Sequence, residues 1–86
     1  MYNFTQHAED DTWTVDIDKS RGYGVFERTA TGHGGGLWFD FDPFLGEDRT
    51  GKLVLMDYDG FFALPRKVGA LLEDLGYVVY DDCYAD

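Results

Sequence analysis

Residues 12–17 form the most regular segment of the chain, Thr12-Trp13-Thr14-Val15-Asp16-Ile17, in which polar and apolar side chains alternate strictly. Side chains at positions i and i+2 of a β-strand lie on the same face, so this alternation predicts a strand with one buried face. That face is expected to contain Trp13, Val15 and Ile17. The next residues, Asp18–Gly22, are rich in turn formers, and Tyr23–Thr29 has the composition of a second strand. Together the two segments predict an antiparallel hairpin.

Two more strands are expected before Gly60. The glycine-rich residues Gly32–Gly36 predict a flexible loop, after which the alternation resumes and ends at Pro43. In this third strand, the residues expected on the buried face are Leu37, Phe39 and Phe41. The residues expected on the exposed face are Trp38, Asp40 and Asp42. A turn over residues 46–51 leads to a fourth strand, Lys52–Tyr58.

One helix is expected, over residues 65–75. Pro65 suits its first turn, and Gly76 is placed to end it in a left-handed conformation. The apolar residues that recur at helical spacing are Leu64, Val68, Leu71, Leu72 and Leu75. Residues 77–80 are expected to form a last strand. The sequence therefore predicts an α+β fold of order β-β-β-β-α-β, in which one helix covers one face of a mainly antiparallel sheet of about five strands.

The 86 residues are expected to form a single domain, residues 1–86, with a loosely ordered arm at 1–11 and a frayed acidic tail at 81–86. A hydrophobic content of 44% and an aromatic content of 17% favour a folded chain over a disordered one. No apolar stretch approaches the roughly 18 residues that a membrane span needs. The polar N-terminus does not resemble a secretory signal, so a cytoplasmic protein is expected.

Acidic residues dominate the charge of the chain, since 17 Asp and Glu oppose 7 Lys and Arg and give a formal net charge of −10. Self-repulsion of this size opposes folding, which indicates that the acidic residues serve another purpose. Solubility alone is the alternative explanation. Three pairs of aspartates are spaced so that both members lie on one face of a strand, about 6.6 Å apart. The pairs are Asp16 with Asp18, Asp40 with Asp42, and Asp57 with Asp59.

These six aspartates and Trp38 are the candidate partner-binding residues. Trp38 shares its expected face with Asp40 and Asp42, and an exposed tryptophan beside carboxylates is typical of a binding hot spot. Duplex DNA carries one charge per roughly 3.4 Å along each strand, and cationic grooves that receive DNA would also accept a rigid row of carboxylates. Direct binding to nucleic acid is not expected, because like charges repel.

Enzymatic and metal-binding functions are weaker alternatives. Leu53–Gly60 resembles the nucleophile motif of haloacid-dehalogenase-type phosphatases, which implies Asp57 as nucleophile and Asp59 as acid. That family also needs a later lysine and a further acidic pair on a larger parallel sheet, and the short remainder of the chain supplies little of this. Residues 16–27 match part of a calcium loop, but Arg21 stands where glycine is required. We therefore expect no catalytic residues, no cofactor and no dedicated metal site, with weak calcium binding left open.

In size, acidity and mixed sheet-plus-helix layout, the chain resembles small proteins encoded by phages and mobile elements, anti-CRISPR proteins in particular. This class-level resemblance includes the segment 53–80, with Asp57-Tyr58-Asp59-Gly60, Leu64-Pro65 and Leu75-Gly76-Tyr77. It implies a location in the cytoplasm of a bacterial host cell and binding to a CRISPR effector complex where target DNA enters, and it assigns no role to a residue.

The sequence thus predicts a non-enzymatic acidic inhibitor that binds a basic nucleic-acid-handling complex, with DNA mimicry that blocks target-DNA binding as one mechanism. Two alternatives stay open. The first is an immunity or antitoxin protein that neutralises a basic nuclease toxin. The second is an accessory domain whose acidic surface is merely solvated. The oligomeric state is not predicted.

Overall fold

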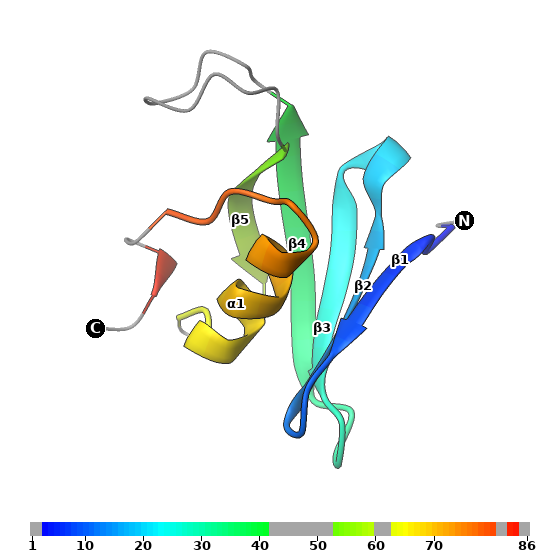
Figure 1. Cartoon of the computed structure of the whole chain (residues 1–86), viewed down its shortest axis with the longest axis vertical. Helices are drawn as coiled ribbons and strands as arrows, with labels where there is room; N and C mark the ends of the chain where they lie inside the picture. The colour runs from blue at the N-terminus through cyan, green and yellow to red at the C-terminus, as the bar shows by residue number, and fades with distance from the viewer. Residues whose placement is uncertain (1–2, 42–52, 60–62, 81–82, 85–86) are drawn as a thin grey trace.

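The computed structural model describes residues 3–41, 53–59, 63–80 and 83–84 (Figure 1). Its strands are β1 (Gln6–Glu9), β2 (Trp13–Asp18), β3 (Tyr23–Arg28), β4 (Gly34–Phe41) and β5 (Leu53–Asp59). A short 3₁₀ turn, η1 (Lys19–Arg21), joins β2 to β3, and the helix α1 (Arg66–Asp74) follows β5. The sheet has the order β1-β2-β3-β4-β5, and every neighbouring pair is antiparallel. The predicted α+β class, an antiparallel sheet with one helix, is confirmed for the described residues.

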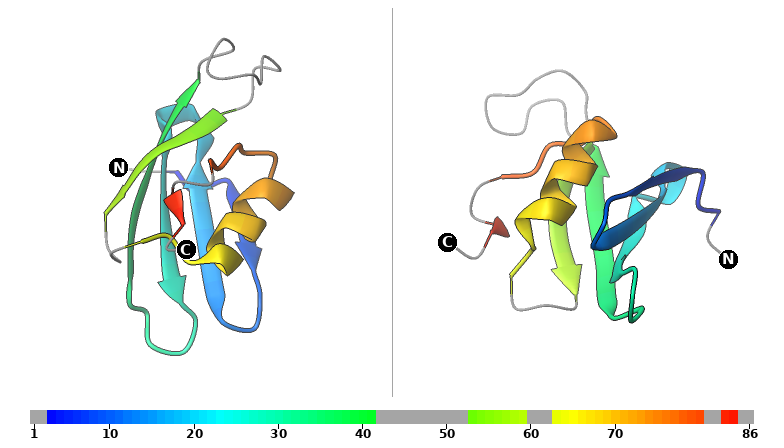
Figure 2. Two further views of the ribbon diagram at one scale, coloured as in Figure 1. Left: turned by 90° about the vertical axis from the view of Figure 1, so that its left-hand side faces the viewer. Right: turned by 60° about the horizontal axis from the view of Figure 1, so that its bottom comes forward.

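The helix lies on one face of the sheet (Figure 2). Between them is the core, to which the sheet contributes Trp13, Val15, Ile17, Phe26, Leu37 and Phe39. The helical side contributes Leu64, Val68, Leu71 and Leu72. The buried faces predicted for residues 12–17 and for the helix are therefore confirmed, as are Leu37 and Phe39. Phe41 belongs to β4, but its expected inward side chain lies outside the described residues. No helix among the described residues is long and apolar enough to cross a membrane.

The first and last predicted elements differ from the structure. Residues 6–9, which the sequence places in a loose arm, form the edge strand β1, where His7 pairs with Asp16 and Ala8 with Val15. Residues 77–80 form no strand. Tyr77 instead remains attached to the helix, because its N–H donates to the Leu72 carbonyl oxygen at 3.0 Å. The four strands expected from residue 12 to residue 58 are present, and β1 adds one at the edge.

The glycine run also departs from its prediction, because β4 begins at Gly34 instead of after a loop. Gly34 pairs with Glu27, and Gly36 pairs with Val25. A Cβ at Gly34 would collide with the backbone of β3, and a Cβ at Gly36 would lie 3.2 Å from the Tyr23 hydroxyl. These two glycines are therefore explained by the close packing of the β3 backbone and the Tyr23 ring against them, and the loop expected at this position is not formed.

The C-terminal end of α1 has the predicted cap. Gly76 adopts a φ of 96°, and its N–H donates to the Glu73 carbonyl oxygen at 2.9 Å. With the bond from Tyr77 to Leu72, this is the Schellman arrangement, in which a left-handed glycine satisfies the last carbonyls of a helix.

Residues 83–84, which the sequence places in a frayed tail, contact the helix and the sheet. The Leu64 N–H donates to the Cys83 carbonyl oxygen at 3.0 Å, and the Tyr58 hydroxyl donates to the same oxygen at 3.1 Å. The Tyr84 ring lies against Gly69 of α1, where a side chain would collide with it. This part of the C-terminal segment is therefore attached to the domain.

Candidate protein-binding surface

The face of the sheet opposite α1, here called the open face, carries the polar positions of the strands. Residues paired across antiparallel strands share a face, so the register defines which side chains lie there. Its described members are His7, Glu9, Thr14, Asp16, Asp18, Tyr23, Val25, Glu27 and Trp38. Since α1 and the apolar core occupy the other face, the described helix covers none of these residues (Figure 2).

An aromatic row crosses the open face and consists of Phe4, Tyr23 and Trp38. The centroids of the Phe4 and Tyr23 rings are 6.4 Å apart, and those of Tyr23 and Trp38 are 4.5 Å apart. Both outer members are unusually exposed for large apolar residues, Phe4 at 43% and Trp38 at 45%. The predicted outward orientation of Trp38 is confirmed, and the row gives it aromatic neighbours that the sequence did not identify.

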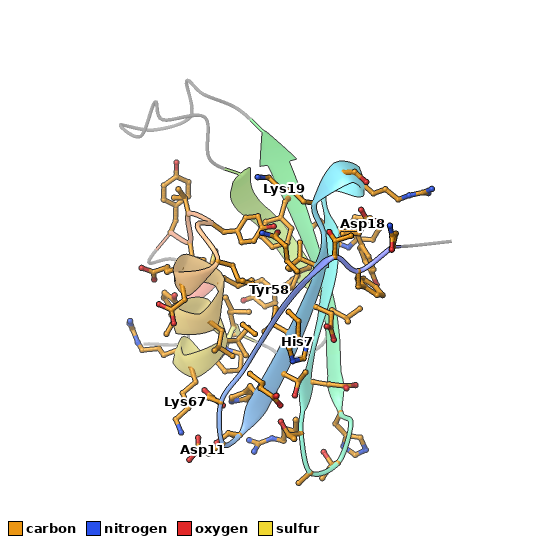
Figure 3. The ribbon with its side chains drawn as sticks, turned by 45° about the vertical axis from the view of Figure 1, so that its right-hand side comes forward. His7, Asp11, Asp18, Lys19, Tyr58 and Lys67 are labelled. Atoms are coloured by element: carbon orange, nitrogen blue, oxygen red, sulfur yellow. The ribbon has the colours of Figure 1, made fainter. Side chains whose placement is uncertain are left out.

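Asp18 does not present its carboxylate to solvent, although the sequence proposes it as a partner-binding residue. It is 1% exposed and accepts hydrogen bonds from the Asn3 N–H at 2.9 Å, the Ser20 hydroxyl at 2.7 Å and the Arg21 N–H at 3.3 Å. These bonds, the one from Asn3 foremost, lower the pKa of the Asp18 carboxyl. Asp18 therefore fixes η1 and the segment that carries Phe4, at the position labelled in Figure 3.

Asp16 lies on the open face and is paired with a histidine. Nδ1 of His7 is 2.7 Å from Oδ1 of Asp16, and Nε2 of His7 is 3.6 Å from Oε1 of Glu9. The hydrogen bond with Asp16 is the main cause of a raised pKa for His7. Protonation of His7 therefore neutralises part of the acidic surface, and the surface is most negative when the imidazole is neutral.

The remaining candidate aspartates are placed only by their backbone. Asp57 of β5 pairs with Trp38, so its backbone continues the line of paired residues that contains Tyr23 and Trp38. Asp59 pairs with Gly36, which belongs to the neighbouring line on the same face. Asp40 pairs with Val54 beyond a register shift between Trp38 and Phe39. The side chains of these three aspartates, and Asp42 as a whole, lie outside the described residues.

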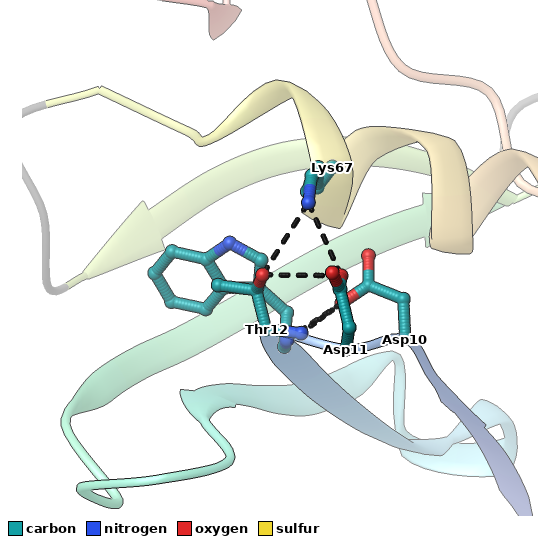
Figure 4. A network of polar contacts seen from close by, with 5 residues as sticks. Asp10, Asp11, Thr12 and Lys67 are labelled. Carbon is teal, nitrogen blue, oxygen red and sulfur yellow. Dashed lines mark hydrogen bonds and ion pairs between the residues drawn. The ribbon is translucent and has the colours of Figure 1, made fainter.

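A second polar network lies at the other end of β1 and ties the helix to the sheet. Nζ of Lys67 is 3.1 Å from Oδ1 of Asp11 and 3.3 Å from Oγ1 of Thr12 (Figure 4). The hydrogen bond from Lys67 is the main cause of a lowered pKa for Asp11. In the same turn, Oδ1 of Asp10 accepts hydrogen bonds from the N–H groups of Thr12 and Trp13. This network is structural and does not extend to the open face.

No group of three or more His, Cys, Asp or Glu in the described part of the chain is arranged to hold a metal ion. Comparisons with protein-family models, curated proteins and solved structures found no match. The open face thus combines an aromatic row with carboxylates from β1, β2 and β3, of which Asp16 lies one same-face step from the row and Glu9 and Glu27 lie two steps from it.

Sequence reasoning missed Phe4, Tyr23, Glu9, Glu27 and His7 as members of this surface. The alternation through Tyr23–Thr29 contains the signal for Tyr23 and Glu27, because the hairpin register places every second residue opposite the core. Phe4, which precedes β1, and His7, which lies within it, lack such a signal, since β1 has a single apolar residue, Ala8, and is recognisable only once it is paired with β2.

Proposed function

We propose that the protein is a non-enzymatic inhibitor of the anti-CRISPR type, which binds the basic surface of a nucleic-acid-handling complex and competes with nucleic acid for it. The observation that carries this proposal is Trp38, which is 45% exposed on the open face, the face of the sheet that also carries Asp16 and Glu27. Tryptophan is enriched among binding hot spots, and carboxylates on the same face favour a basic partner.

The arrangement of the carboxylates supports competition with nucleic acid. Asp16 is the diagonal neighbour of Glu9 on β1 and of Glu27 on β3, which places each pair of Cβ atoms roughly 7–8 Å apart. Such separate charges on a rigid sheet resemble the discrete charges of a phosphate backbone more than a single acidic cluster does. With a formal net charge of −10, the chain is also steered toward cationic grooves and away from DNA or RNA.

Displacement of labelled target DNA from purified partners tests the proposal. CRISPR effector complexes and basic nucleases are the partners to try, at low and at physiological salt. We expect one of them to lose DNA binding, with an affinity for the inhibitor that falls as salt rises, because exposed charges are screened beyond about 8 Å at physiological ionic strength.

Two matched variants assign the effect to the open face. Glu9→Gln/Glu27→Gln removes two charges from this face, whereas Glu73→Gln/Asp74→Asn removes two exposed charges from α1. The first should weaken inhibition substantially more than the second. If the partner still binds its nucleic acid normally in the complex, the competitive mechanism is wrong. Neutralisation of a nuclease toxin instead of a CRISPR complex would favour the immunity-protein function.

A further inference from the structure

We infer that the aromatic row Phe4, Tyr23 and Trp38 is a docking surface for arginine side chains of the partner, whose guanidinium groups stack on the rings beside the carboxylates of the open face. The inference rests on the proposed function and deepens it, because it names the residue type that the surface recognises.

The three rings form one continuous strip, in which the two outer residues, Phe4 and Trp38, are the exposed ones. Tyr23 is its centre, since its ring lies over Gly36 and packs against Trp38 at a centroid distance of 4.5 Å. The absence of a side chain at Gly36 lets the Tyr23 ring lie close to the sheet instead of standing away from it. The exposed fraction of Trp38, 45%, shows that much of the indole is open to solvent.

Charge complementarity selects a cation for this strip. Asp18 is the strand partner of Tyr23, and Asp16 lies two residues before Asp18 on the same face, about 6.6 Å along β2. Asp16 is therefore the diagonal neighbour of Tyr23 on the open face, with roughly 7–8 Å between the Cβ atoms, and supplies a carboxylate on one side of the row. The whole chain adds a long-range attraction, since its formal net charge is −10.

Among the cationic side chains, arginine fits better than lysine. Its guanidinium is planar, is more weakly hydrated than an ammonium group and stacks on aromatic faces while it donates to carboxylates. The described residues already contain examples of the same contact. The guanidinium carbon of Arg28 lies 4.7 Å from the centroid of the Trp13 ring, and that of Arg66 lies 4.5 Å from the centroid of the Tyr84 ring.

The buried Asp18 prepares the end of the row. Its Oδ2 accepts the N–H of Asn3 at 2.9 Å, which holds the next residue, Phe4, over Tyr23. Asp18 is therefore a positioning residue for the docking surface, and it does not contact the partner itself.

Dye-labelled oligo-arginine and oligo-lysine peptides of equal length test the inference by fluorescence anisotropy. Because the two peptides carry the same charge, the long-range attraction is the same for both. A difference between their affinities therefore reports the stacking of guanidinium groups. We expect oligo-arginine to bind about two- to fivefold more tightly, the range that one exposed cation–π contact provides. Trp38→Leu should abolish this preference, and Trp38→Phe, which keeps a ring, should retain part of it. Glu9→Gln/Glu27→Gln should weaken both peptides by the same factor.

Equal affinities for the two peptides, or a preference that survives Trp38→Leu in a variant with an unchanged melting temperature, would overturn the inference. These results are independent of the test of function. An inhibitor that displaces DNA but shows no preference for arginine would retain the proposed function without this surface chemistry. A preference for arginine without displacement of DNA would retain this surface chemistry and contradict the proposed competition with nucleic acid.

Discussion

The imidazole of His7 and the carboxylate of Asp16 lie on paired residues of β1 and β2, with 2.7 Å between Nδ1 and Oδ1. This is the closest contact between a basic and an acidic side chain on the open face, and it connects the charge of that face to pH.

The His7–Asp16 pair should make stability depend on pH. The pKa of His7 is raised in the folded state from 6.5, so the pair contributes its full stabilisation below that pH and loses it as pH rises through the higher, folded pKa. Titration of the His7 ring by NMR should show the raised value, and Asp16→Asn should bring it down. An unchanged His7 titration in Asp16→Asn would contradict the hydrogen bond.

Asp18→Asn should lower the melting temperature more than Asp11→Asn does, because Asp18 is buried and accepts three hydrogen bonds, whereas Asp11 is exposed. The pKa of Asp18 is lowered in the folded state, so its stabilisation is present above its ordinary value of 3.8 and is lost as pH falls through the folded value. Thermal unfolding of both variants at neutral and acidic pH measures this, and the deficit of Asp18→Asn should shrink in acid.

Gly69→Ala should destabilise the domain, although alanine favours helix over glycine by about 1 kcal/mol. The new methyl group would collide with the Tyr84 ring, and such overpacking costs about 1–3 kcal/mol. In a Tyr84→Ala background, the same substitution should become stabilising. A double-mutant cycle by chemical denaturation measures the coupling, and independent effects would show that Tyr84 does not pack on the helix.

Tyr77→Phe should loosen β1. The Tyr77 hydroxyl donates to Oε1 of Gln6, and loss of one such bond costs about 0.5–1.5 kcal/mol. Hydrogen exchange should therefore accelerate at the amides of β1. Tyr58→Phe, which removes a hydroxyl bonded to the Cys83 carbonyl oxygen, is the matched control and should leave β1 protected. Equal exchange in the two variants would show that Tyr77 does not secure the strand.

The strands from residue 12 onward and the helix were predictable because each has its own hydrophobic period. Residues 12–17 repeat every two positions, and the helical segment repeats at three or four. β1 was not predictable, because Gln6–Glu9 becomes a strand through pairing with β2 and through the bond from Tyr77, 71 residues away. Tyr77–Tyr80 has strand composition, but the helix cap directs Tyr77 into the core instead.

The candidate site was predictable only in part, for a related reason. Alternation alone places Trp38 outward, because Leu37 and Phe39 must face the core. It also places Asp16 and Asp18 on one face, which the register confirms. The burial of Asp18 depends on Asn3, 15 residues earlier, and no local pattern reports a contact of that kind. The place of Phe4 in the aromatic row was not predictable for the same reason, since Phe4 directly follows Asn3.

The sequential order of the strands has a consequence for folding kinetics. Every strand pairs with the strand that precedes it, so the sheet has low contact order and needs only hairpin closures. The contacts that join α1 to the first hairpin link residues much farther apart in the sequence, such as Lys67 and Asp11, which are separated by 56 residues. Because the entropy of loop closure grows with length, we expect the helix to dock after the hairpins have formed. The open face would then be assembled before the core on the other side of the sheet is closed.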